Sequence, residues 1–473
     1  MIVENKSRKN DISIYLSAFF LAVIIIIFYA GLSTIFNKED VDDAWMLSFF
    51  YNVFVKNMPP ETTFGGVLSN LKLFEMTQAF IYSQFLNIVG WTKGNAHLLS
   101  SIFILLSGAV WFFIFRKMRF SMKLSLFTAL LMVWSEPFFR EATIARPEAL
   151  TFFLVSLSFL SFISGWHLSS GVLALIAFEN HPMGIIVFIY ILSWIISEWS
   201  VFFKVKTTAI KKLLFFLVGI IIGSVYYFTL HYSGLSGINI FVQEGMRGFL
   251  ITVLYQYFFV TAKYYRHIVE LVFFSACLLI FIRKGFFNKQ KFILIFLTGI
   301  LAANFLNPRP NFHYTIYFYP SFLLLSLAAL EKIDKMMWGV SFLFVLFLAY
   351  YLSIYYRNHD YNFNTYSTRI ASIVPADNLP VVGSPNEWFA FKDREFYPAT
   401  YTGYFNTSAP AFYLIKEDNY RNGYSDAPGN VRFKEIIASN YTEKSVESLE
   451  IYGETYEVVR MSRNTKTATK GKP

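Results

Sequence analysis

An uninterrupted apolar stretch near the N-terminus decides the fold class. Residues 12–36 read ISIYLSAFFLAVIIIIFYAGLSTIF, without one charged side chain. A helix of about 20 apolar residues crosses a hydrocarbon layer of about 30 Å. Lys6, Arg8 and Lys9 precede the stretch, as in a signal peptide. Its length and the lack of a small-x-small cleavage motif nevertheless indicate an uncleaved transmembrane helix.

The rest of the chain has a similar composition. Of its 473 residues, 55% are hydrophobic and only 15% are charged, which indicates an all-α polytopic membrane protein. Apolar runs between polar breaks predict about eleven spans. They lie near residues 12–36, 97–115, 122–135, 147–163, 170–178, 184–203, 213–231, 268–282, 292–304, 314–330 and 336–356.

The distribution of Lys and Arg predicts the orientation. With the N-terminus in the cytoplasm, the predicted cytoplasmic segments hold 17 Lys and Arg in 48 residues, against 10 in 121 residues of the predicted external loops. Cytoplasmic loops are enriched in basic residues, which supports this orientation. One predicted cytoplasmic turn, Ser164 to Ser169, has no Lys or Arg, and fusing its flanking spans would invert everything downstream. The net charge of +10 is assigned to cytoplasmic loops, so we expect no nucleic acid partner.

Composition changes near residue 356. Residues 1–356 form the predicted transmembrane domain with a large first external loop at 37–96, whereas residues 357–473 are of mixed charge and rich in Asn and Tyr. We expect residues 357–473 to form a small extracytoplasmic α/β domain, with strands at 380–383 and 412–415 and a hairpin at 449–459. In the first loop, Met76 to Val89 predicts a helix in the membrane interface or a re-entrant hairpin.

Two neighbouring acids, Asp42 and Asp43, follow the first span at its predicted external end. Carboxylates at this place can accept a proton from an acceptor hydroxyl or hold a divalent cation such as Mg or Mn. The alternative is a solvated acidic loop. The apolar segment Trp45 to Phe50 would anchor the acids at the membrane surface, which favours a functional role.

Basic residues gather on the same predicted face. Arg146 precedes Pro147 and Glu148, which suit the first turn of a helix. A guanidinium there can bind phosphate oxygens with two N–H groups, although a capping or snorkelling role is an equal alternative. His181 follows the fifth span and could bind phosphate, act as an acid or ligate a metal. The other basic candidates, for which interfacial anchoring is the alternative, are Lys263, Arg266, Arg309 and His313.

Several other chemistries lack their residues. The sequence has no Gly-Lys-Ser/Thr phosphate loop, no His-Glu-x-x-His motif and no pair of cysteines, because Cys277 is alone. ATP-driven transport and zinc proteolysis are therefore disfavoured. No chain of ionisable residues lies within a predicted span, which argues against a proton-coupled transporter.

The order of these features resembles the GT-C superfamily of membrane glycosyltransferases, which use lipid-phosphate sugars and include protein O-mannosyltransferases and aminoarabinose transferases. The matching pieces are Asp42-Asp43, Ala145 to Leu150, His181-Pro182, Asn311 to Tyr314 with Tyr319-Pro320, and Asn386 to Phe389. The resemblance implies that Asp42 or Asp43 is the general base or assists a metal. It implies substrate or phosphate binding by Arg146, His181, Lys263, Arg266, Arg309, His313 and Tyr314. The sequence departs from the family pattern in two places. Asp-Asp replaces an Asp-Glu pair, and the usual Lys-Pro-Pro segment is not found in the first loop. Lys72 is therefore only a loose counterpart of the family's phosphate-binding lysine.

The predicted function is transfer of a sugar from a polyprenyl-phosphate carrier to an extracytoplasmic glycan, lipid or protein, by an enzyme of the inner cell membrane. Two alternatives stay open. A transporter or flippase for lipid-linked sugars would need a polar path through the helices. A glycan polymerase or ligase would use similar large external loops.

Overall fold

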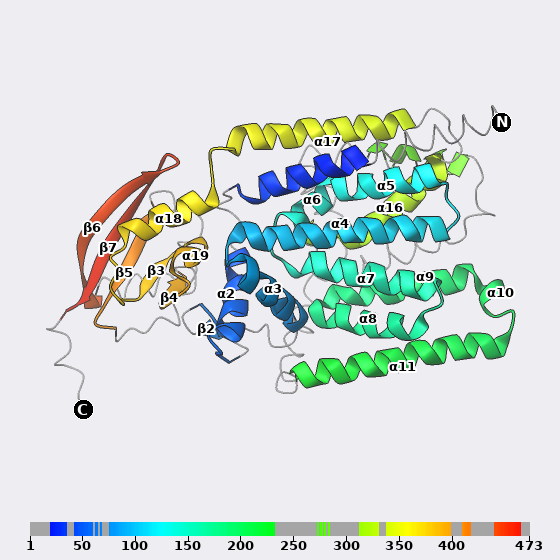
Figure 1. Ribbon diagram of the computed structural model, residues 1–473, viewed down its shortest axis with the longest axis horizontal. Coiled ribbons are helices and arrows are strands. Elements are labelled where there is room, and N and C mark those ends of the chain that lie inside the picture. The colour runs from blue at the N-terminus through cyan, green and yellow to red at the C-terminus, as the bar shows by residue number, and fades with distance from the viewer. Residues whose placement is uncertain are drawn as a thin grey trace. The chain divides into compact units, whose positions relative to one another are not determined.

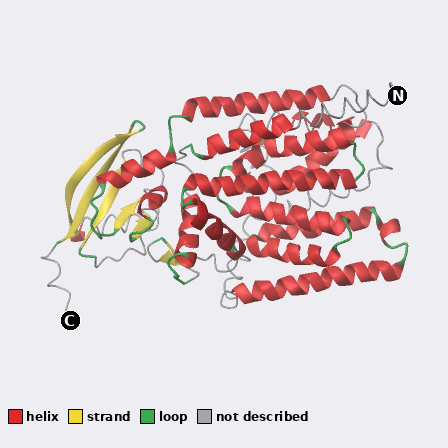
Figure 2. Cartoon of the chain, viewed as in Figure 1, coloured by secondary structure: helices red, strands yellow, loops and turns green. Residues whose placement is uncertain are grey.

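The computed structural model describes residues 19–35, 42–59, 62–64, 67–68, 75–231, 312–330, 337–398, 409–417 and 439–464, with scattered positions between 272 and 283. Helices dominate, and the strands are few (Figure 2). The chain divides into two compact units, each built from separated segments. Unit 1 comprises Met1–Gly31, Lys72–Gln78 and Leu98–Tyr355, and unit 2 comprises Leu32–Leu71, Ala79–His97 and Tyr356–Pro473.

Unit 1 is a set of helices that run alongside one another (Figure 1). It begins with the helix Phe19–Ser33. The helices that follow belong to unit 1 in whole or for most of their length. They are α4 (Lys93–Lys117), α5 (Met122–Trp134), α6 (Glu136–Ala142), α7 (Pro147–Ile163), α8 (His167–Asn180), α9 (Ile186–Ser197), α10 (Trp199–Phe202), α11 (Lys206–His231), α16 (Thr315–Leu330) and α17 (Met337–Asn358), with 3-10 turns η2 (Pro182–Ile185) and η7 (Phe312–Tyr314).

Glycine sets the spacing between α8 and α11. A Cβ added at Gly171 would lie 2.2 Å from the carbonyl oxygen of Phe216, and one at Gly219 would lie 2.2 Å from that of Leu168. These distances are far below van der Waals contact, so only glycine allows the two backbones to approach this closely. Small residues serve the same purpose in membrane helix pairs, where packing contributes much of the association energy.

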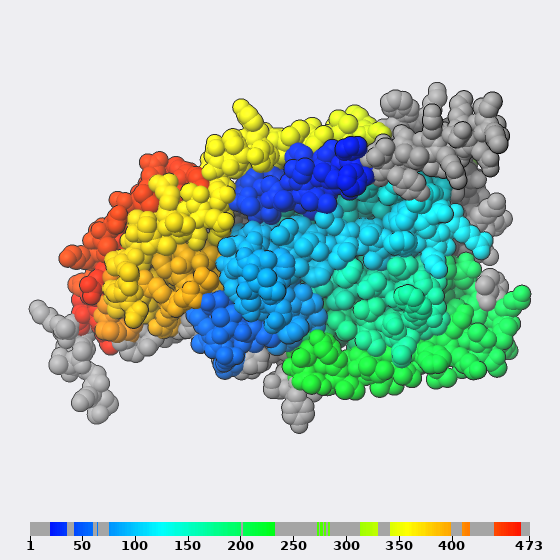
Figure 3. All heavy atoms as spheres, viewed as in Figure 1, coloured from blue at the N-terminus to red at the C-terminus, as the bar shows by residue number. Residues whose placement is uncertain are grey.

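The outer side of α11 is apolar. Its exposed side chains include Leu214, Phe215, Leu217, Val218, Ile221, Ile222 and Val225. The helix lies at the surface of unit 1 and is drawn green in Figure 3. An apolar stripe of this length is unfavourable in water and is accommodated by lipid hydrocarbon.

Two described helices, α4 and α11, are long and apolar enough to cross a membrane. The pair α6 and α7 also passes this test, but is bent by 116° at its break. The remaining apolar helices of the described residues, such as α5 and α16, are shorter. The chain is thus a mostly helical membrane protein, and the predicted count of eleven spans is not confirmed. The predicted span 292–304 lies outside the described residues, and 268–282 is described only at scattered positions.

The uncharged turn between 164 and 169 separates two helices. Ser164 is the C-cap of α7, and Gly165 adopts a left-handed φ of +92° before α8 begins at His167. The Trp166 N–H then donates to the Ser161 carbonyl at 2.9 Å. Glycine reaches this backbone region without steric cost, so the chain reverses here without extending α7.

Unit 2 combines segments of the first loop with the C-terminal part of the chain. Its helices are α2 (Asp42–Phe54), most of α3 (Met76–Val89), α18 (Phe363–Ile373) and α19 (Trp388–Phe391), with the turn η8 (Pro385–Glu387). A small hairpin pairs β1 (Thr62–Thr63) with β2 (Val67–Leu68). The bounds of α3 equal those predicted for the interface helix of the first loop.

The main sheet of unit 2 has five strands in the order β4-β3-β5-β7-β6. They are β3 (Val381–Gly383), β4 (Phe396–Pro398), β5 (Ala411–Glu417), β6 (Tyr441–Ile451) and β7 (Glu454–Arg463). β3 pairs in parallel with β4 and β5, whereas β7 is antiparallel to β5 and β6. The predicted strands and hairpin are present, and the hairpin is longer than expected.

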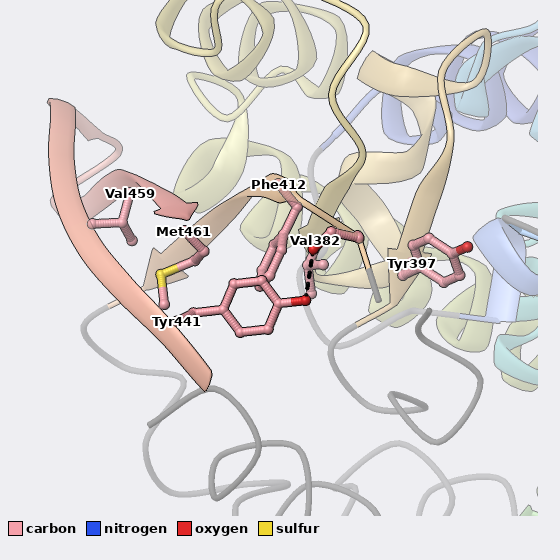
Figure 4. Packing of buried hydrophobic residues seen from close by; sticks show 7 residues of the cluster. Val382, Tyr397, Phe412, Tyr441, Val459 and Met461 are labelled. Carbon is pink, nitrogen blue, oxygen red and sulfur yellow. Dashed lines mark hydrogen bonds between the residues drawn. The ribbon is translucent and has the colours of Figure 1, made fainter. Parts of the chain in front are cut away.

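Aromatic and branched side chains form the core on one side of this sheet. Val382, Phe412, Val459 and Met461 are almost fully buried beside Tyr441 (Figure 4). The Tyr441 hydroxyl donates to the Ala409 carbonyl at 2.9 Å, so the buried phenol keeps a hydrogen bond. This core has no cysteine among the residues described, and it is stabilised by packing.

Candidate functional site

The predicted site residues that the structure describes lie in two groups of buried or partly buried side chains, one group in each unit. The α2 cluster consists of Asp42, Asp43, Lys93 and His97 in unit 2. The corner cluster consists of Glu141, Arg146, Glu148, His181, His313 and Tyr314 in unit 1, around the bend between α6 and α7. Predicted residues Lys72, Lys263, Arg266 and Arg309 lie outside the described residues.

The α2 cluster begins at the first turn of α2, which Asp42 and Asp43 open. Negative side chains are favourable at this end of a helix because the first N–H groups are unpaired there. Asp43 is fully buried, and its Oδ2 lies 3.1 Å from Lys93 Nζ and 2.8 Å from His97 Nε2. Lys93 and His97 are one turn apart at the start of α4, so one carboxylate pairs with both.

The contacts of His97 define its protonation. Its Nδ1 lies 3.0 Å from the carbonyl oxygen of Ser33, while its Nε2 faces Asp43 Oδ2. A carbonyl and a carboxylate can only accept, so both ring nitrogens must carry protons unless Asp43 holds the second proton. Lys93 also lies over the ring of Phe363, at 5.3 Å from its centroid. Asp43 is therefore the shared hydrogen-bond partner of two buried basic side chains.

The structure gives Asp42 and Asp43 different environments, although the sequence treats them alike. Asp43 is buried against Lys93 and His97, whereas Asp42 is only partly buried. Lys93 and His97 were not predicted as site residues. Their spacing of four residues at the start of a helix was a weak signal, because nothing in the sequence names their partner.

Both acids were also predicted as metal ligands. Among the described residues, no group of three or more His, Cys, Asp and Glu side chains is placed to hold a metal. The Lys93 ammonium, 3.1 Å from Asp43 Oδ2, would repel a divalent cation bound to the same oxygen. The residues around Asp43 therefore fit a metal poorly.

The corner cluster begins where the chain turns by 116° between α6 and α7. Arg146 is the N-cap of α7 and Pro147 occupies its first turn, as predicted. Arg146 donates from Nε and Nη2 to the two oxygens of Glu148, at 3.2 and 2.9 Å. The Glu148 side chain is fully buried. This two-pronged ion pair fixes the guanidinium at the corner.

A second pair, between an acid and a histidine, completes the corner cluster. His313, in η7, lies with Nδ1 2.6 Å from Oε1 of Glu141 on α6. The ring of Tyr314 lies 5.5 Å from the ring of His181. The fold thus brings together four predicted residues, Arg146, His181, His313 and Tyr314, with two acids, Glu141 and Glu148. The sequence indicated Glu148 only as a helix cap and gave no role to Glu141.

His181 is neutral at physiological pH. Burial lowers the pKa of its imidazole to about 4, even though the Glu148 carboxylate raises it. Its Nδ1 accepts the N–H of Met183 at 3.2 Å, so the single ring proton lies on Nε2. His181 is therefore a hydrogen-bond donor and not a cation.

A third buried pair fixes the start of α3. Glu179 is fully buried and accepts the N–H groups of Met76 and Thr77 at 2.9 and 3.1 Å, together with the Thr77 hydroxyl. His231, at the end of α11, donates from Nε2 to the same carboxylate at 2.8 Å. Glu75, just before α3, has a left-handed φ of +75°, which is costly for a residue with a Cβ. Glu179 and His231 were not predicted.

Comparison with known proteins identifies the fold. No family model and no curated protein matches the chain in sequence. In structure, the chain has a GT-C-like fold, as the order of its motifs implied. The likeness is to ArnT from Cupriavidus metallidurans. The ArnT structure bound to undecaprenyl phosphate superposes with a TM-score of 0.64 at 10% identity, over 93% of this chain and 97% of ArnT. Apo ArnT gives a TM-score of 0.63, also at 10% identity, over 94% and 97%.

Proposed function

We propose that this protein is a glycosyltransferase that takes one sugar from a polyprenyl-phosphate carrier and transfers it to an extracytoplasmic glycan, lipid or protein. The observation that carries the proposal is the fold, which follows 97% of the length of an ArnT structure that holds undecaprenyl phosphate. Paired acids after the first apolar helix and a charged corner in the helical unit supply groups suited to this chemistry. The enzyme would lie in the inner membrane, with its N-terminus in the cytoplasm and residues 357–473 outside.

Asp42 is the better candidate for the general base. The acceptor hydroxyl oxygen attacks the anomeric carbon and gives its proton to the carboxylate, while the bond from that carbon to the phosphate oxygen breaks. The polyprenyl phosphate leaves with the electron pair. Asp43 is already bound by Lys93 and His97, so its part is to place the first turn of α2 and with it Asp42.

The leaving phosphate needs cations close to its oxygens. Arg146 and His313 each already face a carboxylate within the corner cluster, at 2.9 and 2.6 Å, and His181 is neutral. Phosphate binding by Lys72, Lys263, Arg266 and Arg309 stays a prediction from sequence.

The test is sugar transfer by the purified full chain in lipid nanodiscs, supplied with undecaprenyl-phosphate sugars and a mixture of glycan and lipid acceptors. We expect Asp42→Asn to lower kcat by about 10²–10⁴-fold with an unchanged melting temperature. The matched control is Asp360→Asn, because the Asp360 side chain is 83% exposed, and it should keep full activity.

Two outcomes would contradict the proposal. Full activity of Asp42→Asn would show that Asp42 is not the general base. Movement of lipid-linked sugar across a vesicle bilayer, with no sugar transferred to any acceptor, would instead establish a flippase. Mass spectrometry of surface glycans and lipids from cells that express each variant equally would identify the acceptor.

A further inference from the structure

Three buried oxygens beside the α6–α7 bend lack hydrogen-bond partners within the described part of the chain. They are Glu141 Oε2, Gln78 Oε1 and Asn180 Oδ1. The exposed fraction is 1% for Glu141 and 0% for Gln78 and Asn180. Buried polar atoms in native proteins are nearly always paired, so three unpaired acceptors around one bend require an explanation.

The other polar atom of each side chain ties it to the bend. Gln78 Nε2 donates to the Ala145 carbonyl at 3.3 Å, and Asn180 Nδ2 donates to the Pro147 carbonyl at 3.1 Å. These two carbonyls flank Arg146. Glu141 Oε1 accepts from His313 at 2.6 Å. The three side chains are thus held in place by Gln78 Nε2, Asn180 Nδ2 and Glu141 Oε1. Their other oxygens can accept hydrogen bonds from a ligand.

The charges of the corner cluster select the kind of donor. A phosphate group is negative and has few protons to give, and it would meet the two carboxylates Glu141 and Glu148. Arg146 and His313 already have these acids as partners. A sugar ring carries no charge, and each hydroxyl both donates and accepts. The hydroxyls of a sugar can therefore donate hydrogen bonds to the acceptor oxygens and accept them from N–H groups, while the ion pairs stay intact.

Aromatic side chains add a second property of sugar sites. The ring of Tyr314 lies 5.5 Å from that of His181 and 6.5 Å from that of Tyr317. Aromatic rings present an apolar face on which the C–H side of a sugar ring can pack, while polar groups at the edge bind hydroxyls.

We propose that the corner cluster, with Gln78 and Asn180, binds the sugar of the lipid-linked donor through its hydroxyl groups. Glu141 Oε2, Gln78 Oε1 and Asn180 Oδ1 accept hydrogen bonds from these hydroxyls. This inference rests on the proposed function and sharpens it, because it moves the donor phosphate away from Arg146 and His313.

The test compares two ligands that differ only by the sugar. Full-length protein in nanodiscs is titrated with undecaprenyl phosphate and with undecaprenyl phosphate that carries arabinose, mannose or glucose, and the best-bound sugar is kept. The variant is Glu141→Gln, which keeps the shape and an oxygen for His313 but puts a donating NH₂ in the place of Oε2. We expect it to weaken binding of the sugar-bearing lipid about 10-fold and to leave binding of undecaprenyl phosphate unchanged.

Two further variants keep the result interpretable. Glu136→Gln is the control, because Glu136 is also a buried acid on α6 and pairs with Arg140, and it should not change the ratio of the two affinities. Gln78→Met keeps charge and length but removes both the acceptor oxygen and the Nε2 donor to the Ala145 carbonyl, and it replaces Glu141→Gln if that variant does not fold.

The outcomes separate the inference from the function beneath it. Equal weakening of both ligands would assign the corner to phosphate and overturn the inference. Unchanged binding of both by Glu141→Gln and Gln78→Met would show that water satisfies these oxygens, and would overturn it too. A wild-type protein that binds neither ligand would instead refute the proposed function.

Discussion

Replacing Asp43 by Asn separates the roles of the two acids most clearly. Asn keeps the shape of the side chain but removes the charge that Lys93 and His97 share at 3.1 and 2.8 Å. These basic side chains are only 1% and 4% exposed, so water cannot replace the lost carboxylate. Removing one partner of a buried ion pair costs about 3–5 kcal/mol, because the other charge stays buried.

The expected loss can be converted into a melting temperature. In a domain of about 150–250 residues, each kcal/mol lowers the melting temperature by about 2–4 °C. We therefore expect unit 2 of Asp43→Asn to melt roughly 6–20 °C below the wild type. Tryptophan fluorescence of the protein in nanodiscs can follow this transition, because Trp45, Trp91 and Trp388 belong to unit 2.

Two companion variants test the reasoning. Lys93→Met added to Asp43→Asn removes one of the unpaired charges and should restore part of the lost stability. Asp42→Asn should leave the melting temperature within about 1 °C of the wild type, since a partly exposed side chain is replaced by one of equal size. An unchanged melting temperature in Asp43→Asn, or a large drop in Asp42→Asn, would refute the assignment of the structural role to Asp43.

Three further predictions concern other parts of the molecule. The pKa of His181 is lowered to about 4 from 6.5, so the unfolded chain takes up the proton at a higher pH than the folded chain does. The contribution of His181 to the free energy of unfolding should be fully present above pH 6.5. It should fall by up to about 3 kcal/mol as the pH drops to 4. A scan of melting temperature against pH checks this, and His181→Gln should flatten the curve. Because Lys93 already pairs with Asp43, sugar transfer should continue in the presence of EDTA. A strict requirement for added Mg or Mn would instead support metal binding by Asp42 and Asp43, as predicted from sequence. Gly219→Leu should abolish the close contact of α8 and α11, since even a Cβ would lie 2.2 Å from the Leu168 carbonyl oxygen. The yield of folded protein in detergent should then fall sharply. Leu217→Ala, at an exposed site, should have little effect.

Local sequence signals predicted the elements well where they were strong. Pro147 and Glu148 mark the start of α7, and a mostly apolar run without charged residues leads to its end at Ile163, so the predicted bounds agree with the structure. The bounds of α3 were correct because its apolar residues recur at helical spacing, and Gly453 marked the turn of the β6–β7 hairpin with a φ of +78°. Helix caps, periodicity and turn residues act within a few positions, which a single sequence displays.

The pairings that shape the candidate sites were not predictable in this way. Asp43 and His97 are 54 positions apart, and Glu141 and His313 are 172 apart. Which charges meet depends on how the helices pack, and many acids and bases in the chain could satisfy the same rule. The sequence therefore indicated the residue types around each helix end, but could not show that His313 meets Glu141 or that His97 meets Asp43.

The Glu179 pair also orders events during synthesis of the chain. Thr77 precedes Glu179 by 102 positions, and Glu179 precedes His231 by 52. At roughly 5–20 residues per second, the start of α3 leaves the ribosome about 8–30 s before His231 does. During that interval α3 lacks the carboxylate that caps it and then the histidine that balances that carboxylate. The contacts that hold the start of α3 are therefore complete only after His231, at the end of α11, has been synthesised.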